Sequence, residues 1–203
     1  LFALLEWNNP GTIGNLTPGG KILASLFQSV TLRTAGFASF NQDALTEASK
    51  VLSDLLMFVG GSSGSTAGGV KTVTLGLVVL SAISTMRGRR QVTVFGRSIS
   101  QEDIANAVSI ALLVMGLSLL GAAVITVCDG CSFMNAIYET ISALCTVGLT
   151  TGITPTLCTA SKLILIVFMF FGRVGIMTIG VGFMMGDRAK ERVQYAQTKV
   201  MIG

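Results

Sequence analysis

One uncharged apolar segment constrains the fold more than any other feature of the chain. The segment, Ile104–Val127, reads IANAVSIALLVMGLSLLGAAVITV and contains no charged residue. A helix rises about 1.5 Å per residue, so a helix over these residues would span the roughly 30 Å hydrocarbon core of a bilayer. A second apolar segment, Lys162–Met185, has a single interior charge at Arg173. The two segments predict a membrane protein that crosses the bilayer more than once.

The composition supports this prediction and argues against other classes of protein. Hydrophobic residues make up 51% of the chain and charged residues 12%, and the mean hydropathy is +0.72, whereas about 25% of the residues of a soluble domain are charged. The basic residues lie in two short clusters, residues 86–97 and the C-terminal tail, so we expect no nucleic-acid partner. The positive-inside rule predicts that both clusters are cytoplasmic. Their basic residues are Arg87, Arg89, Arg90, Arg97, Arg188, Lys190, Arg192 and Lys199.

Two further regions do not form simple membrane spans. Phe133–Leu144 reads as a short amphipathic helix, and the irregular stretch CTVGLTTGITP follows it, which predicts a re-entrant loop. Residues Asp43–Thr85 contain two apolar runs, neither of which comfortably spans the core alone. We therefore expect one span that is broken in the middle by GGSSGSTAGGVKT, Gly60–Thr72.

An internal repeat organises the chain. TAGF at Thr34–Phe37 matches TVGL at Thr146–Leu149, and MFVGG at Met57–Gly61 matches MFFGR at Met169–Arg173. Both pairs are separated by 112 residues (34 to 146 and 57 to 169). A shared separation without gaps indicates two related units. Each unit is predicted to contain a short pore-type helix, a T-x-G-x turn and a membrane span, and the two units run in the same direction.

The T-x-G-x turns predict ion coordination. Potassium-type filters are rings of backbone carbonyls built around T-V-G sequences. Threonine can add a hydroxyl oxygen, and glycine permits the left-handed backbone that aims consecutive carbonyls inward. A single T-x-G is a common turn, but two at one separation, each after a short helix, favour a filter. The predicted filter residues are Thr34, Ala35, Gly36, Phe37, Thr146, Val147, Gly148 and Leu149.

These stretches resemble the membrane subunit of the bacterial Ktr and Trk potassium transporters, whose superfamily includes fungal Trk and plant HKT proteins. The resemblance rests on SVTLRTAGF, MFVGGSSGSTAGGVKTVTLG, VFGRSI, TVGLTTGITP and FMFFGRVGIMTIG, and it favours the Ktr branch. It implies an all-α membrane protein with parallel helix–pore-loop–helix repeats, of which two of four are present. Residues 1–97 would be the third repeat and residues 98–203 the fourth. Because Leu1–Leu5 reads as the tail of an apolar segment, we expect a fragment that lacks the first two repeats.

The resemblance also implies a function and partners. The function would be potassium uptake across the bacterial plasma membrane by a multi-pass subunit that is not an enzyme and binds no cofactor in this chain. A sodium-coupled or sodium-selective transporter is the main alternative, and a non-conducting scaffold is a weaker one. The implied partners are membrane lipid, the missing N-terminal half of the same subunit, a second copy in a homodimer, and a cytoplasmic nucleotide-binding regulatory subunit.

The glycine-rich segment is interpreted as a gate. In the family, the third inner helix contains a flexible intramembrane loop below the filter, and this loop maps onto Gly60–Gly69. Glycines make such a backbone mobile, while serine and threonine hydroxyls can satisfy polar groups that lipid cannot. A structural kink is the alternative. The predicted gate residues are Gly60, Gly61, Ser62, Ser63, Gly64, Ser65, Thr66, Ala67, Gly68 and Gly69.

Arg173 is predicted to belong to the same gate. A charge in the middle of a span costs about 2.5–3.5 kcal/mol on insertion scales, and such residues usually face a pore or a partner. The repeat aligns Arg173 with Gly61, so we expect the arginine to face the pore, contact the loop and raise the barrier to cations. The family assigns the corresponding arginine a gating role. Pairing with a carboxylate such as Asp54 is the alternative.

Three other polar residues have open roles at this point. Asp54 and Glu139 could each attract cations or anchor backbone amides, and the sequence does not decide between these roles. Lys71 could end the intramembrane loop or interact with the partners of the loop.

Two motifs point to other chemistry and fail on inspection. The glycine-rich segment is close to the phosphate-binding loop G-x-x-x-x-G-K-[ST], but Val70 separates Gly69 from Lys71, which argues against an NTPase. Cys128 and Cys131 have C-x-x-C spacing, but the chain has no second such pair and no histidine, which argues against a zinc site. A disulfide between these two cysteines is an alternative to incidental apolar cysteines.

Overall fold

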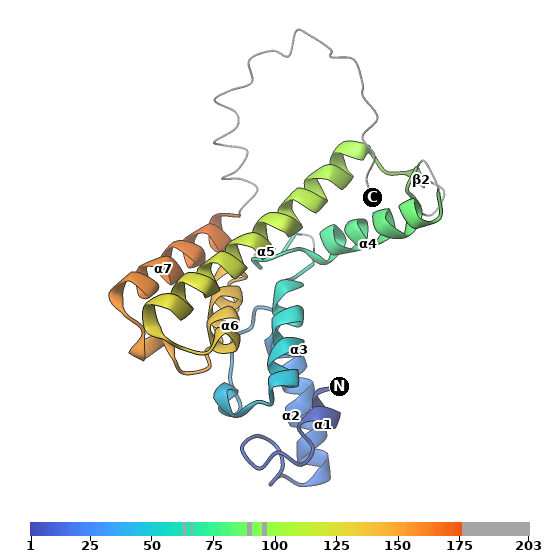
Figure 1. The fold of residues 1–203 in the computed structure, drawn as a ribbon. Coiled ribbons are helices and arrows are strands. Elements are labelled where there is room, and N and C mark those ends of the chain that lie inside the picture. The colour runs from blue at the N-terminus through green and yellow to red at the C-terminus, as the bar shows by residue number, and fades with distance from the viewer. Residues whose placement is uncertain (63, 66, 89–90, 95–96, 176–203) are drawn as a thin grey trace.

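The computed structural model describes residues 1–175 except residues 63, 66, 89–90 and 95–96. The described part is helical, as the all-α prediction expected, apart from one antiparallel pair of two-residue strands. Figure 1 shows the helices in chain order. The elements are α1 (Phe2–Leu5), α2 (Pro18–Thr31), the 3₁₀ helix η1 (Gln42–Ala44), α3 (Glu47–Phe58), α4 (Thr72–Met86), β1 (Thr93–Val94), β2 (Arg97–Ser98), α5 (Gln101–Asp129), α6 (Phe133–Leu144), the 3₁₀ helix η2 (Thr154–Thr156) and α7 (Thr159–Val174).

The repeat seen in the sequence recurs as a repeat of elements. A first helix pair, α2 and α3, and a second helix pair, α6 and α7, each enclose a turn with a left-handed threonine and then a 3₁₀ helix. The 3₁₀ helices η1 and η2 begin 112 residues apart, at Gln42 and Thr154. The helices α3 and α7 also begin 112 residues apart, at Glu47 and Thr159. The separation in the sequence therefore corresponds to one structural unit used twice.

Helix starts are set by side chains that accept the first free backbone N–H groups. Thr17 caps α2 through Gly20 N–H, and Pro18 occupies the first helical position, where its missing N–H costs nothing. Thr46 and Cys158 occupy the equivalent cap positions of α3 and α7. Ser100 caps α5 through the N–H of Asp103 (3.1 Å). Local sequence signals thus determine where each of these helices begins.

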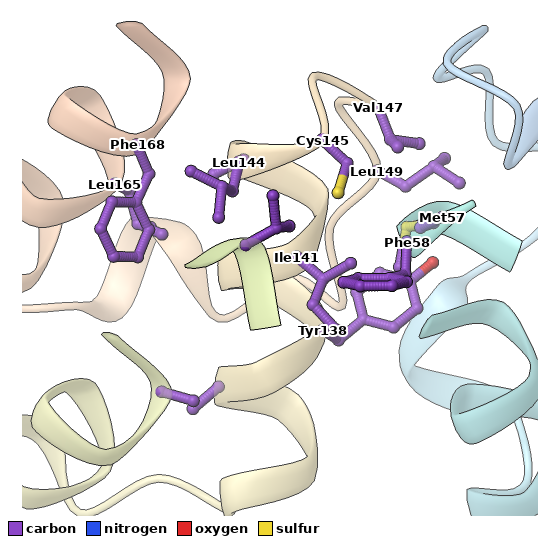
Figure 2. Close-up of a cluster of buried hydrophobic side chains, with 14 of the residues drawn as sticks. Met57, Phe58, Tyr138, Ile141, Leu144, Cys145, Val147, Leu149, Leu165 and Phe168 are labelled. Atoms are coloured by element: carbon purple, nitrogen blue, oxygen red, sulfur yellow. The ribbon is translucent and has the colours of Figure 1, made fainter. Parts of the chain in front are cut away.

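The core is built around α6, the short helix that precedes the second turn. Tyr138, at the centre of α6, is completely buried. Figure 2 shows Met57 and Phe58 of α3 on one side of α6 and Leu165 and Phe168 of α7 on the other. Because α6 is enclosed in this way and α5 also packs on it, the turn that follows it is held from several directions.

The predicted spans have different outcomes. The segment Ile104–Val127 lies within α5, the one described helix whose length and composition suit a membrane span. The predicted break is present, because α3 ends at Phe58 and α4 begins at Thr72 and turns away from α3 (Figure 1), and the assignment of the two helices to one membrane span stays a prediction. Within Lys162–Met185, the structure describes a helix as far as Val174, and the rest of that predicted span lies outside the described residues.

Two further predictions concern the orientation of the chain in the membrane and the state of the cysteines. Arg89, Arg90 and all the basic residues of the C-terminal tail lie outside the described residues, so the predicted orientation stays a prediction. The four cysteines are free thiols in this structure, and the disulfide between Cys128 and Cys131 stays an alternative.

Candidate functional site

The two T-x-G-x turns share an uncommon backbone conformation. Thr34 has a φ of 65° and Gly36 a φ of 75°, while Thr146 has a φ of 58° and Gly148 a φ of 89°. Within the described residues, these two threonines are the only non-glycine residues with positive φ. A β-branched residue avoids this region unless its surroundings enforce it. Both turns therefore alternate left-handed and ordinary backbone conformations, and the surrounding structure holds the threonines in the left-handed region.

Hydroxyl groups of the preceding helix tie down the end of each turn. The Thr31 hydroxyl accepts the N–H of Phe37 (2.8 Å) and donates to the Phe37 carbonyl (2.7 Å). The Ser142 hydroxyl donates to the Leu149 carbonyl (2.5 Å). The last carbonyl of each predicted filter segment is thus bound to its own helix, so Phe37 and Leu149 are less available as ligands than the residues before them.

The remaining carbonyls of the turns accept no hydrogen bond from the described residues. Backbone carbonyls are strong acceptors that folded proteins normally satisfy. In the part of the chain that the structure describes, no hydrogen bond is accepted by six carbonyls, those of Thr34, Ala35, Gly36, Thr146, Val147 and Gly148. Oxygen atoms presented in this way are suited to hard cations such as alkali-metal ions.

The fold brings the two turns together. A side chain at Gly36 would collide with the carbonyl oxygen of Val147, so the backbones of the two turns approach one another closely. The second turn also borders a cavity of about 540 Å³. This cavity is lined by residues that include Glu139, Thr146, Gly148, Thr150, Met169 and Arg173. The two turns therefore adjoin at Gly36 and Val147, and the second turn and Arg173 border one cavity.

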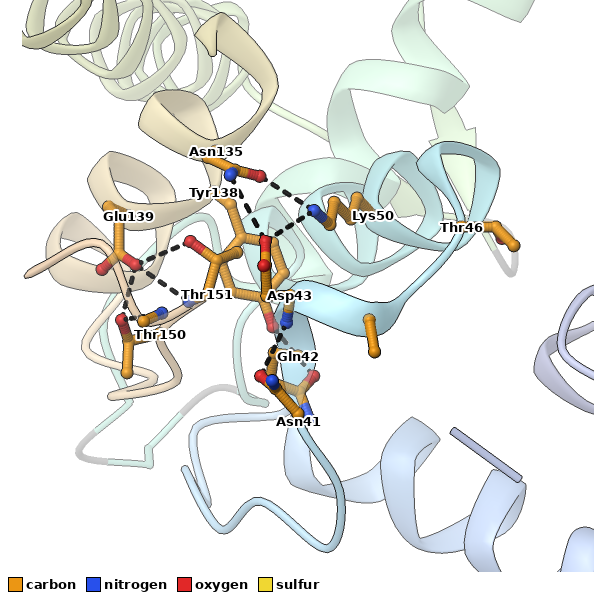
Figure 3. A network of polar contacts seen from close by, with 12 residues as sticks. Asn41, Gln42, Asp43, Thr46, Lys50, Asn135, Tyr138, Glu139, Thr150 and Thr151 are labelled. Atoms are coloured by element: carbon orange, nitrogen blue, oxygen red, sulfur yellow. Dashed lines mark hydrogen bonds and ion pairs between the residues drawn. The ribbon is translucent and has the colours of Figure 1, made fainter. Parts of the chain in front are cut away.

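Glu139 acts as an anchor for the segment after the second turn. Its buried carboxylate accepts hydrogen bonds from the Thr150 hydroxyl (2.6 Å), the Thr151 N–H (2.9 Å), the Thr151 hydroxyl (3.1 Å) and the Thr154 hydroxyl (2.9 Å). Figure 3 shows this carboxylate facing Thr150 and Thr151. These bonds favour the anchoring role over the cation-attracting role that the sequence left open.

The glycine-rich loop is closed at its neck by backbone hydrogen bonds. Gly60 N–H donates to the Val70 carbonyl (2.9 Å), and Val70 N–H donates to the Phe58 carbonyl (3.1 Å). Thr72 N–H donates to the Gly61 carbonyl (3.2 Å). The two ends of the segment therefore lie side by side between α3 and α4.

The loop also reaches the second turn. Gly68 N–H donates to Oγ1 of Thr146 (2.9 Å). Lys71 is the N-cap residue of α4, so it marks the end of the loop, the first of the two roles proposed for it. Ser63 and Thr66, two of the predicted gate residues, lie outside the described residues.

Arg173 and Asp54 occupy different environments. Arg173 lies in the last turn of α7, exposed at the cavity that Thr146 and Gly148 also line. Its predicted contact with the glycine-rich loop and its alternative pairing with Asp54 both stay predictions. Asp54 is buried in α3, and among the described residues nothing donates a hydrogen bond to its Oδ1 atom.

The sequence reasoning missed a carboxylate that fixes the start of the second helix of each pair, α3 and α7. Glu6 accepts from the Thr46 N–H (3.0 Å) and hydroxyl (2.6 Å), and Asp129 accepts from the Cys158 N–H (2.6 Å) and the Ser161 hydroxyl. Burial raises the pKa of Glu6, but hydrogen bonds from neighbouring hydroxyl and amide groups outweigh it and hold the pKa below its usual value. The carboxylates escaped notice because their spacing differs from the 112-residue separation.

A second missed feature is the polar network that joins the two helix pairs. Lys50 Nζ donates to Asn135 Oδ1 (2.9 Å) and lies 3.4 Å from Asp43 Oδ1. The Tyr138 hydroxyl donates to Gln42 Oε1 (3.1 Å), and both side chains are buried. Figure 3 shows these residues between α3 and α6. The network therefore joins η1 and α3 of the first pair to α6 of the second.

Comparisons with known proteins agree on the class of molecule. Residues 1–191 match the TrkH family, described as cation transport proteins. Across 98% of its length, the chain is 39% identical to the Ktr system potassium uptake protein B of Bacillus subtilis, and across its whole length 35% identical to the protein of that name from Vibrio alginolyticus. It is also 35% identical to the potassium/sodium uptake protein NtpJ of Enterococcus hirae.

The comparisons also bear on length and fold. The chain spans 44% of both Ktr proteins and 46% of NtpJ, so it covers less than half of the curated relatives that it matches. The crystal structure of the potassium transporter TrkH from Vibrio parahaemolyticus superposes on 89% of this chain with a TM-score of 0.71, at 23% identity, using 40% of that structure. At this identity the likeness concerns the fold.

Proposed function

Because the chain belongs to the TrkH family of cation transport proteins, we propose that it forms part of a pathway for potassium ions across the bacterial plasma membrane. The observation that carries the proposal is the pair of adjoining turns, whose six carbonyls accept no hydrogen bond from the part of the chain that the structure describes. Relatives named as potassium uptake proteins support the choice of ion. The chain is not an enzyme, since the pathway requires coordination of an ion and no bond is made or broken.

In this pathway the two turns are filter segments. The carbonyls of Thr34–Gly36 and Thr146–Gly148 would replace part of the hydration shell of the ion, as carbonyl rings do in potassium filters. Their alternate left-handed residues aim successive oxygens to one side. A closed ring needs four segments, so we propose that residues 1–97 and 98–203 are the third and fourth repeats of a four-repeat pore. The greater length of the relatives supports two further repeats in an N-terminal half.

Gating is assigned to the glycine-rich loop, Gly60–Gly69, together with Arg173. The loop meets the second turn at Thr146, and Arg173 borders the cavity beside the same residue. A positive charge at this place would raise the barrier to a cation, and movement of the loop would open or close the path. The compact neck at Val70 supports a loop that moves as one body.

The proposed surroundings follow the expectations for the family. The basic connector 86–97 and the C-terminal tail would lie in the cytoplasm, where they can meet a nucleotide-binding regulatory subunit. A second copy of the subunit would complete a homodimer. A sodium-coupled or sodium-selective transporter remains the second candidate function, and the name of the Enterococcus hirae relative, a potassium/sodium uptake protein, favours keeping it.

Uptake of K⁺ and Rb⁺ by a bacterium without its own potassium uptake systems, expressing the whole protein that contains this chain, tests the proposal. We expect uptake that restores growth at low K⁺ and that is reduced in Gly148→Ser, because serine is strained at a φ of 89°. Substitution of Gly76, which lies within α4 with no atom near its Cβ position, by alanine is the matched control. Uptake of Na⁺ in place of K⁺ would favour the second candidate, and unchanged uptake in Gly148→Ser would overturn the filter.

A further inference from the structure

The glycine-rich loop lies directly against the second turn. A Cβ atom at Gly68 would lie 2.8 Å from Oγ1 and from Cγ2 of Thr146. A Cβ atom at Gly69 would lie 2.9 Å from Sγ of Cys145, and Gly69 has a φ of 74°. Real Cβ atoms do not approach neighbours so closely, so the contact depends on glycine at both positions.

One hydrogen bond in this contact involves a predicted ion ligand. Gly68 N–H donates to the hydroxyl oxygen of Thr146, the first residue of the second turn. The equivalent residue of the first turn, Thr34, accepts no such bond from any described residue. The described part of the loop therefore bonds to the Thr146 hydroxyl and not to the Thr34 hydroxyl, although the two threonines occupy equivalent positions in the repeat.

The hydrogen bond and a cation would both draw on the lone pairs of one hydroxyl oxygen. An N–H group points the positive end of its dipole at the oxygen it bonds. A cation coordinated by Thr146 Oγ1 would face that positive end and would have to share the lone pairs of the hydroxyl. A docked loop thus opposes a cation at Thr146, and a cation at Thr146 opposes the docked loop.

We propose that the glycine-rich loop and the transported cation compete for the Thr146 hydroxyl, so that binding of the ion at this end of the second turn releases the loop. The proposal rests on the proposed transport function, whose filter and gate it connects. Because coupling between two binding events is reciprocal, release of the loop must raise the affinity of Thr146 for the ion by the same factor. The position of the loop would then depend on whether a cation is bound at Thr146.

Cys145 provides a reporter for the position of the loop. Its thiol is fully buried, and Gly69 lies against its sulfur. Undocking of the loop uncovers this thiol, so its rate of reaction with N-ethylmaleimide measures the undocked fraction. The experiment uses the whole protein in membranes, with every cysteine other than Cys145 replaced, in K⁺ and in the impermeant cation N-methyl-D-glucamine.

We expect K⁺ to raise the reaction rate of Cys145 in the otherwise native protein. Without K⁺, Thr146→Val should raise the rate about fivefold, which is the factor expected for loss of one hydrogen bond of ordinary strength. The same substitution should abolish the effect of K⁺ on the rate. Gly68→Ala should do the same while keeping the hydroxyl, because its Cβ displaces the loop. Thr34→Val is the matched control and should leave the rate without K⁺ unchanged. Equal rates for Thr146→Val and Thr34→Val would overturn the proposal.

Labelling of Cys145 and uptake of K⁺ together distinguish a failure of this proposal from a failure of the transport function. If Thr146→Val exposes Cys145 but no alkali cation changes the rate in the native loop, the competition is wrong. If K⁺ uptake is intact and Cys145 reacts equally in K⁺ and in N-methyl-D-glucamine, the competition is also wrong while the transport function stands. If the protein takes up neither K⁺ nor Na⁺, the transport function fails and the proposal falls with it.

Discussion

The two helix pairs adopt the same turn in very different surroundings. In the second pair, α6 is enclosed by α3, α5 and α7, and Leu149 at the end of its turn is only 3% exposed. In the first pair, Phe37 at the same position is 70% exposed, and Leu23 and Leu26 of α2 are exposed as well. The threonine and glycine nevertheless keep left-handed backbones in both turns. Within this chain, the same turn conformation therefore occurs both where other described residues bury the turn and where they do not.

The two turns are also held by different numbers of contacts. The first turn is held by Thr31 and by the approach of Gly36 to Val147. The second turn has in addition the anchor at Glu139 and the contact with the glycine-rich loop. Substitutions at equivalent positions should therefore have unequal effects, which can be measured.

The largest expected effect distinguishes the two filter glycines. Alanine at Gly148 meets no atom within 4 Å, so its cost is the left-handed backbone alone, about 1–2 kcal/mol. Alanine at Gly36 carries the same backbone cost and also collides with the Val147 carbonyl. We expect Gly36→Ala to abolish Rb⁺ uptake and Gly148→Ala to retain a measurable part of it. Thermal unfolding of both purified variants should follow the same order, and the reverse order would contradict the asymmetry.

The next effect tests whether Glu139 is an anchor. Glu139→Gln keeps an acceptor for the Thr151 N–H, whereas Glu139→Leu leaves this buried donor without a partner, at a cost of about 1–3 kcal/mol. We therefore expect Glu139→Leu to lower the unfolding temperature and the Rb⁺ uptake much more than Glu139→Gln. Equal losses of uptake in both variants, strongest at low ionic strength, would instead show that the charge attracts cations.

A smaller effect concerns the bond that joins the two pairs. Tyr138→Phe removes the hydroxyl that donates to Gln42 Oε1 inside the protein. We expect a loss of about 1 kcal/mol in the free energy of unfolding, the usual net value of such a bond. Gln42 keeps its bond from Gln28 (2.6 Å), which limits the loss. A double variant with Gln42→Leu should then show less than additive destabilisation, and full additivity would indicate that the two side chains are not coupled.

The sequence predicted local structure better than contacts between distant residues. The helix Phe133–Leu144 was predicted with the bounds that the structure has, because an amphipathic period and a following T-x-G are both local signals. The bond between Gly68 and Thr146 crosses 78 residues and that between Tyr138 and Gln42 crosses 96. Such bonds depend on how the helix pairs dock. No pattern along the chain encodes that arrangement, so the partners of Thr146 and the anchoring role of Glu139 required the structure.

The smallest expected effect comes from exchanging the N-cap residues of α3 and α7. Thr46 caps α3 through its hydroxyl, while Cys158 caps α7 through a sulfur that lies 3.5 Å from the Ser161 N–H. Sulfur is a weak acceptor and threonine is a preferred cap, so Cys158→Thr should stabilise the protein by about 0.5 kcal/mol. The reverse exchange, Thr46→Cys, should cost more than this, because it also removes the hydroxyl bond to Glu6 (2.6 Å). Unfolding temperatures of the two single variants and of the double exchange measure both effects, and a stabilising Thr46→Cys would contradict the equivalence of the two caps.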